Sequence, residues 1–259
     1  MFLLVGAQPL AGACWIAAPL WYAALMRRSW RRARIVREPF PPEWRQVLER
    51  TVVLYRRLAP ERKAAFERDV LIFVREHRFT AAKGVELTDE LKVLAAASAV
   101  MLIFGRTDLD YPRIAEIVFY PDVFDDEYRT AGRGRDIAGL VHPYGAVVLS
   151  VPELRRGFAS AEDGVNVALH EFAHALDLSA QECDGLPLGI PPRLIRPWTE
   201  TMRREMARAG LGASVLRSYA GANEAEFFAT AVEMFFERPE LLRKGNAELY
   251  SLLNEYFGG

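Results

Sequence analysis

The sequence predicts an α+β fold, mostly helical with a small mixed sheet, preceded by an N-terminal helix that crosses a membrane. Three observations predict it. Apolar residues beyond residue 42 recur mainly with helical spacing, two short β-rich runs lie between the helices, and residues 1–26 contain no charged side chain. The 259 residues are 51% apolar and 26% charged with a net charge of −1, which indicates one sizeable globular domain with an ample core.

The N-terminal segment, residues 1–26, is rich in Leu, Ala, Val and Trp and is long enough to span a bilayer. Six arginines follow between Arg27 and Arg37. The positive-inside rule would keep this basic flank in the cytoplasm, with the N-terminus on the other side of the inner membrane. A secretory signal peptide is disfavoured because the basic residues follow the apolar segment rather than precede it.

We therefore predict a transmembrane anchor at 1–26, a basic, proline-containing linker at 27–42 and a cytoplasmic domain at 43–259. Pro9 and Pro19 weaken the prediction of a helix in the anchor. The alternatives are a soluble cytoplasmic protein that begins at Met26, or an N-terminal segment that packs as an ordinary core helix.

The helices and strands of the domain are predicted from the spacing of its apolar residues and from Pro, Gly and Asn residues that end or interrupt regular structure. The expected elements are helices near 43–58, 60–77 and 88–104, strands at 114–120 and 145–151, and helices near 163–178, 192–209, 223–237 and 239–257.

The motif His-Glu-Phe-Ala-His at residues 170–174 is typical of zinc hydrolysis. At 3.6 residues per turn, His170 and His174 lie on one helix face and can reach one metal ion, whereas Glu171 is displaced around the helix and can act as a general base. The flanking residues are apolar nearly all round, which predicts a buried helix. Burying two histidines and a glutamate is costly without a partner, and a metal satisfies all three.

A catalytic zinc usually takes three protein ligands, so a third ligand is expected downstream. The remaining histidines, His77 and His142, both precede the motif, which favours an acidic ligand. The expected helix at 223–237 carries Glu226 and Glu233 among aromatic and aliphatic residues. From spacing alone Glu226 could equally form a helix-capping pair with Asn223.

Several short segments accompany the motif: 117–121, 139–141, 170–177, 184–187, 219–220, 225–229, 235–236 and 239–240. In these segments the chain resembles the Mlc titration factor A peptidases, which are zinc metallopeptidases of the gluzincin type with a core like that of anthrax lethal factor. The resemblance extends over about residues 38–257 and leaves the N-terminal segment outside.

This resemblance implies a zincin-like fold in which His170, His174 and Glu226 bind one Zn²⁺ per chain. It implies that Glu171 is the general base and that the hydroxyl of Tyr219 stabilises the oxyanion. It also implies a peptide or protein substrate and binding to a transcriptional repressor. In gluzincins an edge strand ahead of the zinc helix receives the substrate, so we expect residues 145–151 to bind an extended peptide by strand addition.

The sequence leaves three roles open. Glu233 shares a helix face with Glu226, and we favour it as a partner that orients a ligand histidine rather than as the ligand itself. Asp177 could accept a hydrogen bond from an imidazole or simply be solvated. Without the resemblance, Tyr219 would be read as a core tyrosine with a satisfied hydroxyl.

Three functions compete: a zinc peptidase, a regulatory protein that holds a transcriptional repressor with little or no catalysis, and a structural zinc protein. We favour the peptidase because Glu171 would have no purpose beside a closed site with four protein ligands. No Walker loop, dinucleotide-binding glycine pattern or G-x-S-x-G motif is present. One arginine run in a nearly neutral chain does not predict nucleic-acid binding, and Cys14 and Cys183 predict no disulfide.

Overall fold

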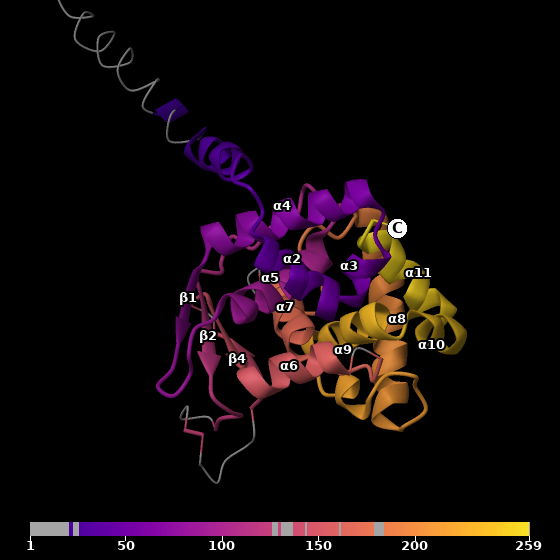
Figure 1. Ribbon diagram of the computed structural model, residues 1–259. Coiled ribbons are helices and arrows are strands. Elements are labelled where there is room, and N and C mark those ends of the chain that lie inside the picture. Colours follow the sequence, from indigo (N-terminus) through magenta and orange to yellow (C-terminus); the bar gives the residue numbers. More distant parts are fainter. Residues whose placement is uncertain are drawn as a thin grey trace, which may run out of the picture. The chain divides into compact units, whose positions relative to one another are not determined.

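The computed structural model describes residues 21–22, 26–125, 129–130, 137–142, 144–160, 162–178 and 184–258. The chain divides into two compact units, Met1–Phe40 and Pro41–Gly259. In the first unit, residues 26–35 form a helix. The second unit contains the labelled helices and strands of Figure 1.

Most of the predicted anchor, residues 1–26, lies outside the described residues, as do Cys14 and Cys183. Every helix in the described part of the chain is too short or too polar to cross a bilayer. The anchor and the linker therefore stay predictions.

The second unit is mostly helical and contains a small mixed sheet, as predicted. Its strands are β1 (Arg78–Ala81), β2 (Glu116–Tyr120), β3 (Gly139–Val141) and β4 (Ala146–Ser150). Their order across the sheet is β1-β2-β4-β3, with β1, β2 and β4 parallel and β3 antiparallel to β4. The sequence predicted β2 and β4 but not the short outer strands, which have too few residues to show a period.

The sheet order corrects one prediction. Residues 145–151 were expected to form an edge strand that binds a peptide, but β4 pairs with β2 on one side and with β3 on the other. Its backbone groups are therefore engaged in the sheet, and strand addition at β4 is wrong. The edge strand on that side is β3.

The helices are α2 (Pro42–Thr51), α3 (Val53–Arg57), α4 (Pro60–Glu76), α5 (Asp89–Ile103), α6 (Val151–Ala159), α7 (Val167–Asp177), α8 (Pro192–Gly210), α9 (Glu224–Glu237), α10 (Pro239–Gly245) and α11 (Ala247–Tyr256), with a 3₁₀ turn, η2, at Ser218–Gly221. Helix α6 was not predicted.

Two predicted helices are each interrupted once. The helix expected at 43–58 breaks at Val52, whose extended backbone separates α2 from α3. The helix expected at 239–257 breaks at Asn246, whose side chain accepts a hydrogen bond from the N–H of Leu249 at 2.9 Å and so starts α11. An asparagine at this position competes with the helix for backbone donors, which accounts for the second break.

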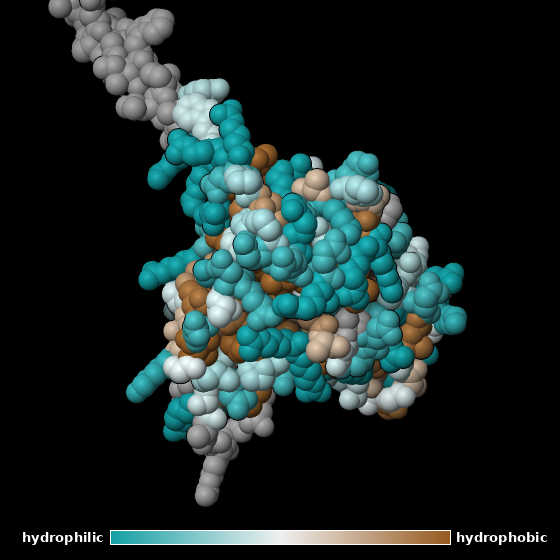
Figure 2. Space-filling model, viewed as in Figure 1, coloured by the Kyte–Doolittle hydropathy of each residue, from teal (hydrophilic) through white to brown (hydrophobic). Residues whose placement is uncertain are grey.

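Helix α7 lies inside the second unit, where it contacts α5, α9, β3 and β4 (Figure 1). Phe172 of α7 has no exposed surface and packs edge to face on Phe73 and Tyr111, with ring centroids 5.7 and 5.5 Å apart. The surface in Figure 2 is mainly hydrophilic, with apolar side chains in small groups. Helix α7 thus has contacts with both helices and strands of the same unit.

Candidate metal centre

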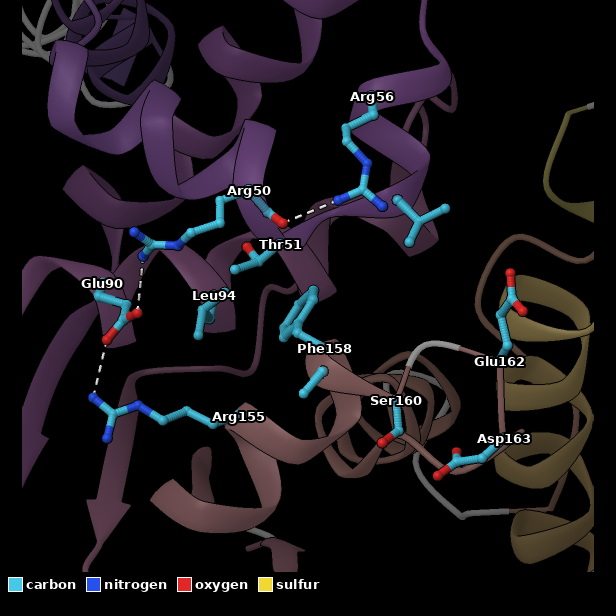
Figure 3. Close-up of a pocket in the computed structure, with 12 residues that line it drawn as sticks. Arg50, Thr51, Arg56, Glu90, Leu94, Arg155, Phe158, Ser160, Glu162 and Asp163 are labelled. Carbon is cyan, nitrogen blue, oxygen red and sulfur yellow. Dashed lines mark hydrogen bonds and ion pairs between the residues drawn. The ribbon is translucent and has the colours of Figure 1, made fainter.

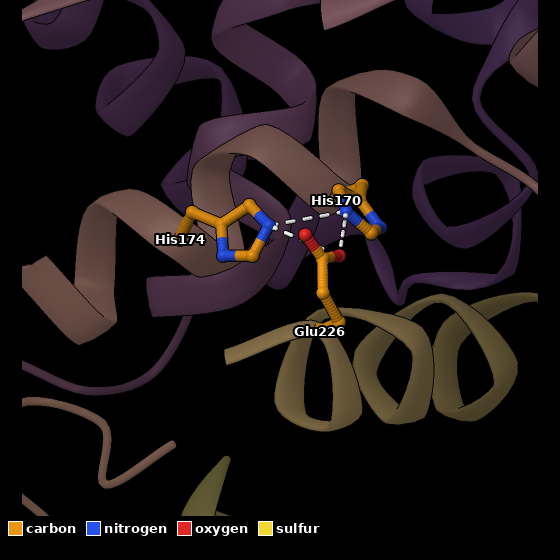
Figure 4. A group of neighbouring side chains, drawn as sticks. All are labelled: His170, His174 and Glu226. Carbon is orange, nitrogen blue, oxygen red and sulfur yellow. Dashed lines mark hydrogen bonds and ion pairs between the residues drawn. The ribbon is translucent and has the colours of Figure 1, made fainter. Parts of the chain in front are cut away.

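The N-terminus of α7 is set by Asn166. Its side-chain oxygen accepts a hydrogen bond from the N–H of Leu169 at 3.1 Å, which satisfies one of the donors that a helix start leaves unpaired. Apolar residues of α7 face the core. His170 and His174 share one face of the helix and both point toward α9 (Figure 4). The helical spacing of the motif thus brings both imidazoles to one place.

Helix α9 brings the third side chain. Asn223 caps α9 by accepting a hydrogen bond from the backbone N–H of Glu226 at 2.9 Å. The carboxylate of Glu226 turns instead toward the two histidines (Figure 4). Spacing alone left it open whether Glu226 forms a capping pair with Asn223. The cap uses only the backbone N–H of Glu226, so its carboxylate is available to the histidines.

The donor atoms of His170, His174 and Glu226 form a compact triangle. Nε2 of His170 lies 3.0 Å from Oε2 of Glu226 and 3.1 Å from Nε2 of His174. Nε2 of His174 lies 3.5 Å from the same carboxylate oxygen. A search of the His, Cys, Asp and Glu side chains of the described residues finds that these three have donor atoms close enough together to hold a metal ion.

The charges of the triangle are coupled. Burial would raise the pKa of Glu226, but hydrogen bonds with His170 and His174 outweigh it and hold that pKa well below its usual range. Burial would lower the pKa of His170, but the carboxylates of Glu226 and Glu233 raise it to about 10. The two carboxylates therefore favour a positive charge at the imidazole of His170.

Glu233 connects the triangle to its surroundings. Its side chain is 1% exposed, and Oε1 accepts a hydrogen bond from the N–H of Asn166 at 2.8 Å. Oε2 lies 3.2 Å from Nδ1 of His170 and also pairs with the guanidinium of Arg217. The carboxylate therefore contacts the ring nitrogen of His170 that faces away from the triangle.

Sequence reasoning missed Arg217. A buried carboxylate such as Glu233 needs a cationic partner, but no rule of spacing connects α9 to the residue before η2. The ion pair fixes the segment that leads into η2, where Tyr219 lies. Tyr219 is 48% exposed, and the centroid of its ring lies 6.2 Å from that of His170.

Glu171 lies against the edge strand. Its residue surface is 6% exposed, and burial raises the pKa of its carboxyl, although the nearby histidines oppose this. A Cβ on Gly139 of β3 would lie 2.6 Å from Cγ and 2.7 Å from Oε1 of Glu171. Glycine at this position therefore lets the strand approach the carboxylate closely.

Asp177 has neither of the roles considered for it from the sequence. It is fully buried, and its Oδ2 accepts a hydrogen bond from the N–H of Gly185 at 3.0 Å. Burial raises the pKa of its carboxyl to about 6. Asp177 thus ties the end of α7 to the loop before α8 rather than orienting an imidazole.

Comparison with known proteins finds relatives that cover most of this chain. A family model described as glucose-regulated metallo-peptidase M90 matches residues 27–258. An uncharacterized protein of Synechocystis sp. is 28% identical over 249 residues, covering 88% of each chain. Mlc titration factor A of Escherichia fergusonii is 27% identical and covers 90% of this chain and 92% of its own. The same factor of Pectobacterium atrosepticum is 29% identical and covers 71% and 74%.

Proposed function

Because this chain belongs to the glucose-regulated M90 metallopeptidase family, we propose that it is a zinc-dependent peptidase whose centre is formed by His170, His174 and Glu226. The membership confirms the resemblance to Mlc titration factor A that the sequence motifs indicated. The observation that carries the proposal is the convergence of three metal-donor atoms from two helices beside a buried glutamate and an open sheet edge.

The donor set fits zinc. Two imidazoles and one carboxylate are typical ligands of a catalytic zinc, and bonds of about 2.0–2.1 Å in a tetrahedron separate two donors by roughly 3.3 Å. The separations of 3.0, 3.1 and 3.5 Å are close to that value. When bound, zinc would polarise the scissile carbonyl and acidify the attacking water.

The protein side chains then have separate tasks. Glu171 takes the proton of the attacking water and passes it to the leaving amine. Its burial favours proton uptake because the neutral carboxyl loses less solvation than the charged carboxylate. Glu233 accepts from Nδ1 of His170, which leaves Nε2 of that ring for the metal. The hydroxyl of Tyr219 stabilises the oxyanion, for which its position beside His170 is suitable.

The substrate is a peptide that adds to the edge of β3. His142 donates its N–H to Ala146 at 2.7 Å, and Ala138 accepts from Ser150 at 2.9 Å, so the backbone groups of residues 138, 140 and 142 face β4. The backbone groups of Gly139 and Val141 face away from β4, on the side where β3 pairs with no other described strand. An extended peptide can pair with them directly above Glu171.

Measurement of bound zinc together with peptide cleavage tests the proposal. The wild-type chain should hold one zinc and cleave members of a peptide library. Glu171→Gln should keep the zinc and lose at least about 100-fold in kcat, as expected for removal of a general base. Glu200→Gln, which changes an exposed glutamate of α8, is the matched control. Undiminished cleavage by Glu171→Gln would refute the assignment of the base, and a wild-type chain without zinc would refute the metal.

The name of the relatives favours a second function. Several are called Mlc titration factor A, and we propose that this chain also binds a transcriptional repressor. Binding that survives in Glu171→Gln would separate this function from catalysis. If a purified repressor retains neither the wild-type chain nor Glu171→Gln in a pull-down, binding to that repressor is excluded.

A further inference from the structure

A cleft of about 750 Å³ lies among α2, α3, α5 and α6 (Figure 3). Three guanidinium groups line it, from Arg50, Arg56 and Arg155. Glu90 accepts a hydrogen bond from Arg50 at 3.2 Å and from Arg155 at 2.9 Å. Arg56 donates to the backbone carbonyl of Arg50 at 3.0 Å and pairs with no carboxylate of the described residues. At this end of the cleft Arg50 and Arg155 thus share a single carboxylate, that of Glu90.

The arginines retain donors for a ligand. A guanidinium carries five N–H groups, and Glu90 engages one nitrogen of Arg50 and one of Arg155. Their side chains are 65% and 52% exposed, so an anion can reach them from solvent. Glu162 and Asp163 lie at the opposite end of the cleft in Figure 3 and would repel an anion toward the arginines.

An apolar cavity of about 330 Å³ adjoins this cleft. The two share Val53, Phe158 and Glu162 as lining residues. The walls of the second cavity are mostly apolar side chains, including Leu54, Leu58, Met101, Leu169, Phe235 and Phe236. Since an apolar cavity of about 150 Å³ can hold benzene, a space of 330 Å³ accommodates roughly twelve carbon atoms.

We propose that the two cavities together bind a single-chain amphiphilic anion with a chain of about ten carbon atoms, in keeping with the volume of the apolar part. Its carboxylate lies between Arg50 and Arg155, and its apolar chain passes Val53 into the second cavity. The charge excess at one end and the apolar walls at the other select a molecule that has both features. This site is separate from the proposed peptidase centre.

The walls of the apolar cavity include parts of both helices of the metal centre. Leu169 directly precedes His170 in α7, and Phe235 lies in α9 together with Glu226. A bound chain would therefore pack against the side of these helices that faces away from the donor triangle.

Titration calorimetry on the full chain tests the proposal, with decanoate as the probe below its micelle concentration. Hexanoate, which has four fewer methylenes, should bind on the order of 100-fold more weakly because it buries less apolar surface. Decanol, which lacks the charge, should bind at least about tenfold more weakly because the hydrogen bonds to a charged head are lost. Equal affinity for all three probes would overturn the proposal whatever the variants do.

Two variants locate the bound molecule. Arg50→Gln with Arg155→Gln should weaken decanoate at least about tenfold and leave decanol unchanged, since only the head contacts are lost. Val53→Trp should weaken both probes because it fills the passage between the cavities. Arg196→Gln, whose side chain is 88% exposed on α8, is the control and should bind decanoate as the wild type does. If the double arginine variant and Val53→Trp both bind decanoate as tightly as the wild type, decanoate adsorbs elsewhere on the protein and the proposed site is refuted.

Discussion

Adding one methyl group to Gly139 tests how closely the edge strand must approach the general base. In Gly139→Ala the new Cβ would lie 2.6 Å from Cγ of Glu171 and 2.8 Å from Cγ2 of Val167. Carbon atoms in contact prefer about 3.5–4.0 Å, so the overlap is roughly 1 Å. Since neither neighbour is a freely exposed side chain, Glu171 or β3 must move by a similar distance.

A displacement of about 1 Å at a catalytic group costs on the order of 100-fold in rate, and overpacking costs about 1–3 kcal/mol of stability. We therefore expect Gly139→Ala to lower kcat about 100-fold while its zinc content stays at the wild-type value, because the three atoms nearest the new methyl belong to Glu171 and Val167 and not to the proposed metal ligands. Peptide hydrolysis, metal analysis and urea unfolding measure the three quantities.

The control for this substitution is Gly210→Ala at the end of α8, where no atom lies within 4 Å of the new Cβ. It should leave kcat unchanged and alter stability by less than about 1 kcal/mol. If Gly139→Ala turns over at the wild-type rate, the close approach of β3 to Glu171 has no part in catalysis and the reasoning fails.

Three further substitutions probe buried carboxylates. Glu233→Gln should weaken zinc binding about 10–100-fold by dialysis against a chelator, because the partner of His170 loses its charge; unchanged affinity would contradict this role. Burial raises the pKa of Glu237 to about 7. Protonation of Glu237 therefore adds its full contribution to the free energy of unfolding below pH 4.5, and this contribution is lost as the pH rises through 7. Glu237→Gln should then unfold at the wild-type urea concentration at pH 4 and be more stable by on the order of 2 kcal/mol at pH 8. Glu67→Gln should cost about 1–3 kcal/mol, since Glu67 accepts a 2.5 Å hydrogen bond from buried Tyr55, whereas the exposed Glu200→Gln should cost at most about 0.5 kcal/mol.

The elements that the sequence predicted well are those with local causes. The motif at 170–174 lies on a helix because its flanks are apolar and Asn166 supplies a cap, and both effects act within a few residues. The helical spacing of His170 and His174 by itself requires that the two imidazoles share a face. The mainly helical composition and the two longer strands, β2 and β4, follow in the same way from periodicity.

The position of Glu226 relative to the histidines depended on how α7 and α9 pack, since spacing alone allowed the carboxylate to serve as a cap. Its place beside His170 is a contact across 56 residues of chain. The pairing of Arg217 with Glu233 also depends on tertiary packing. The sequence offers many acidic residues with which an arginine near a turn could pair, and the fold brings Glu233 next to it.

The sequence by itself determined the His-Glu-x-x-His motif, the family and the kind of secondary structure around the motif, because these depend on residues close together along the chain. Only the tertiary structure decided that β3 rather than β4 forms the edge beside Glu171. The physical reason is that strand order is set by side-chain packing and hydrogen bonds between distant segments, so a run of β-forming residues predicts a strand without its neighbours.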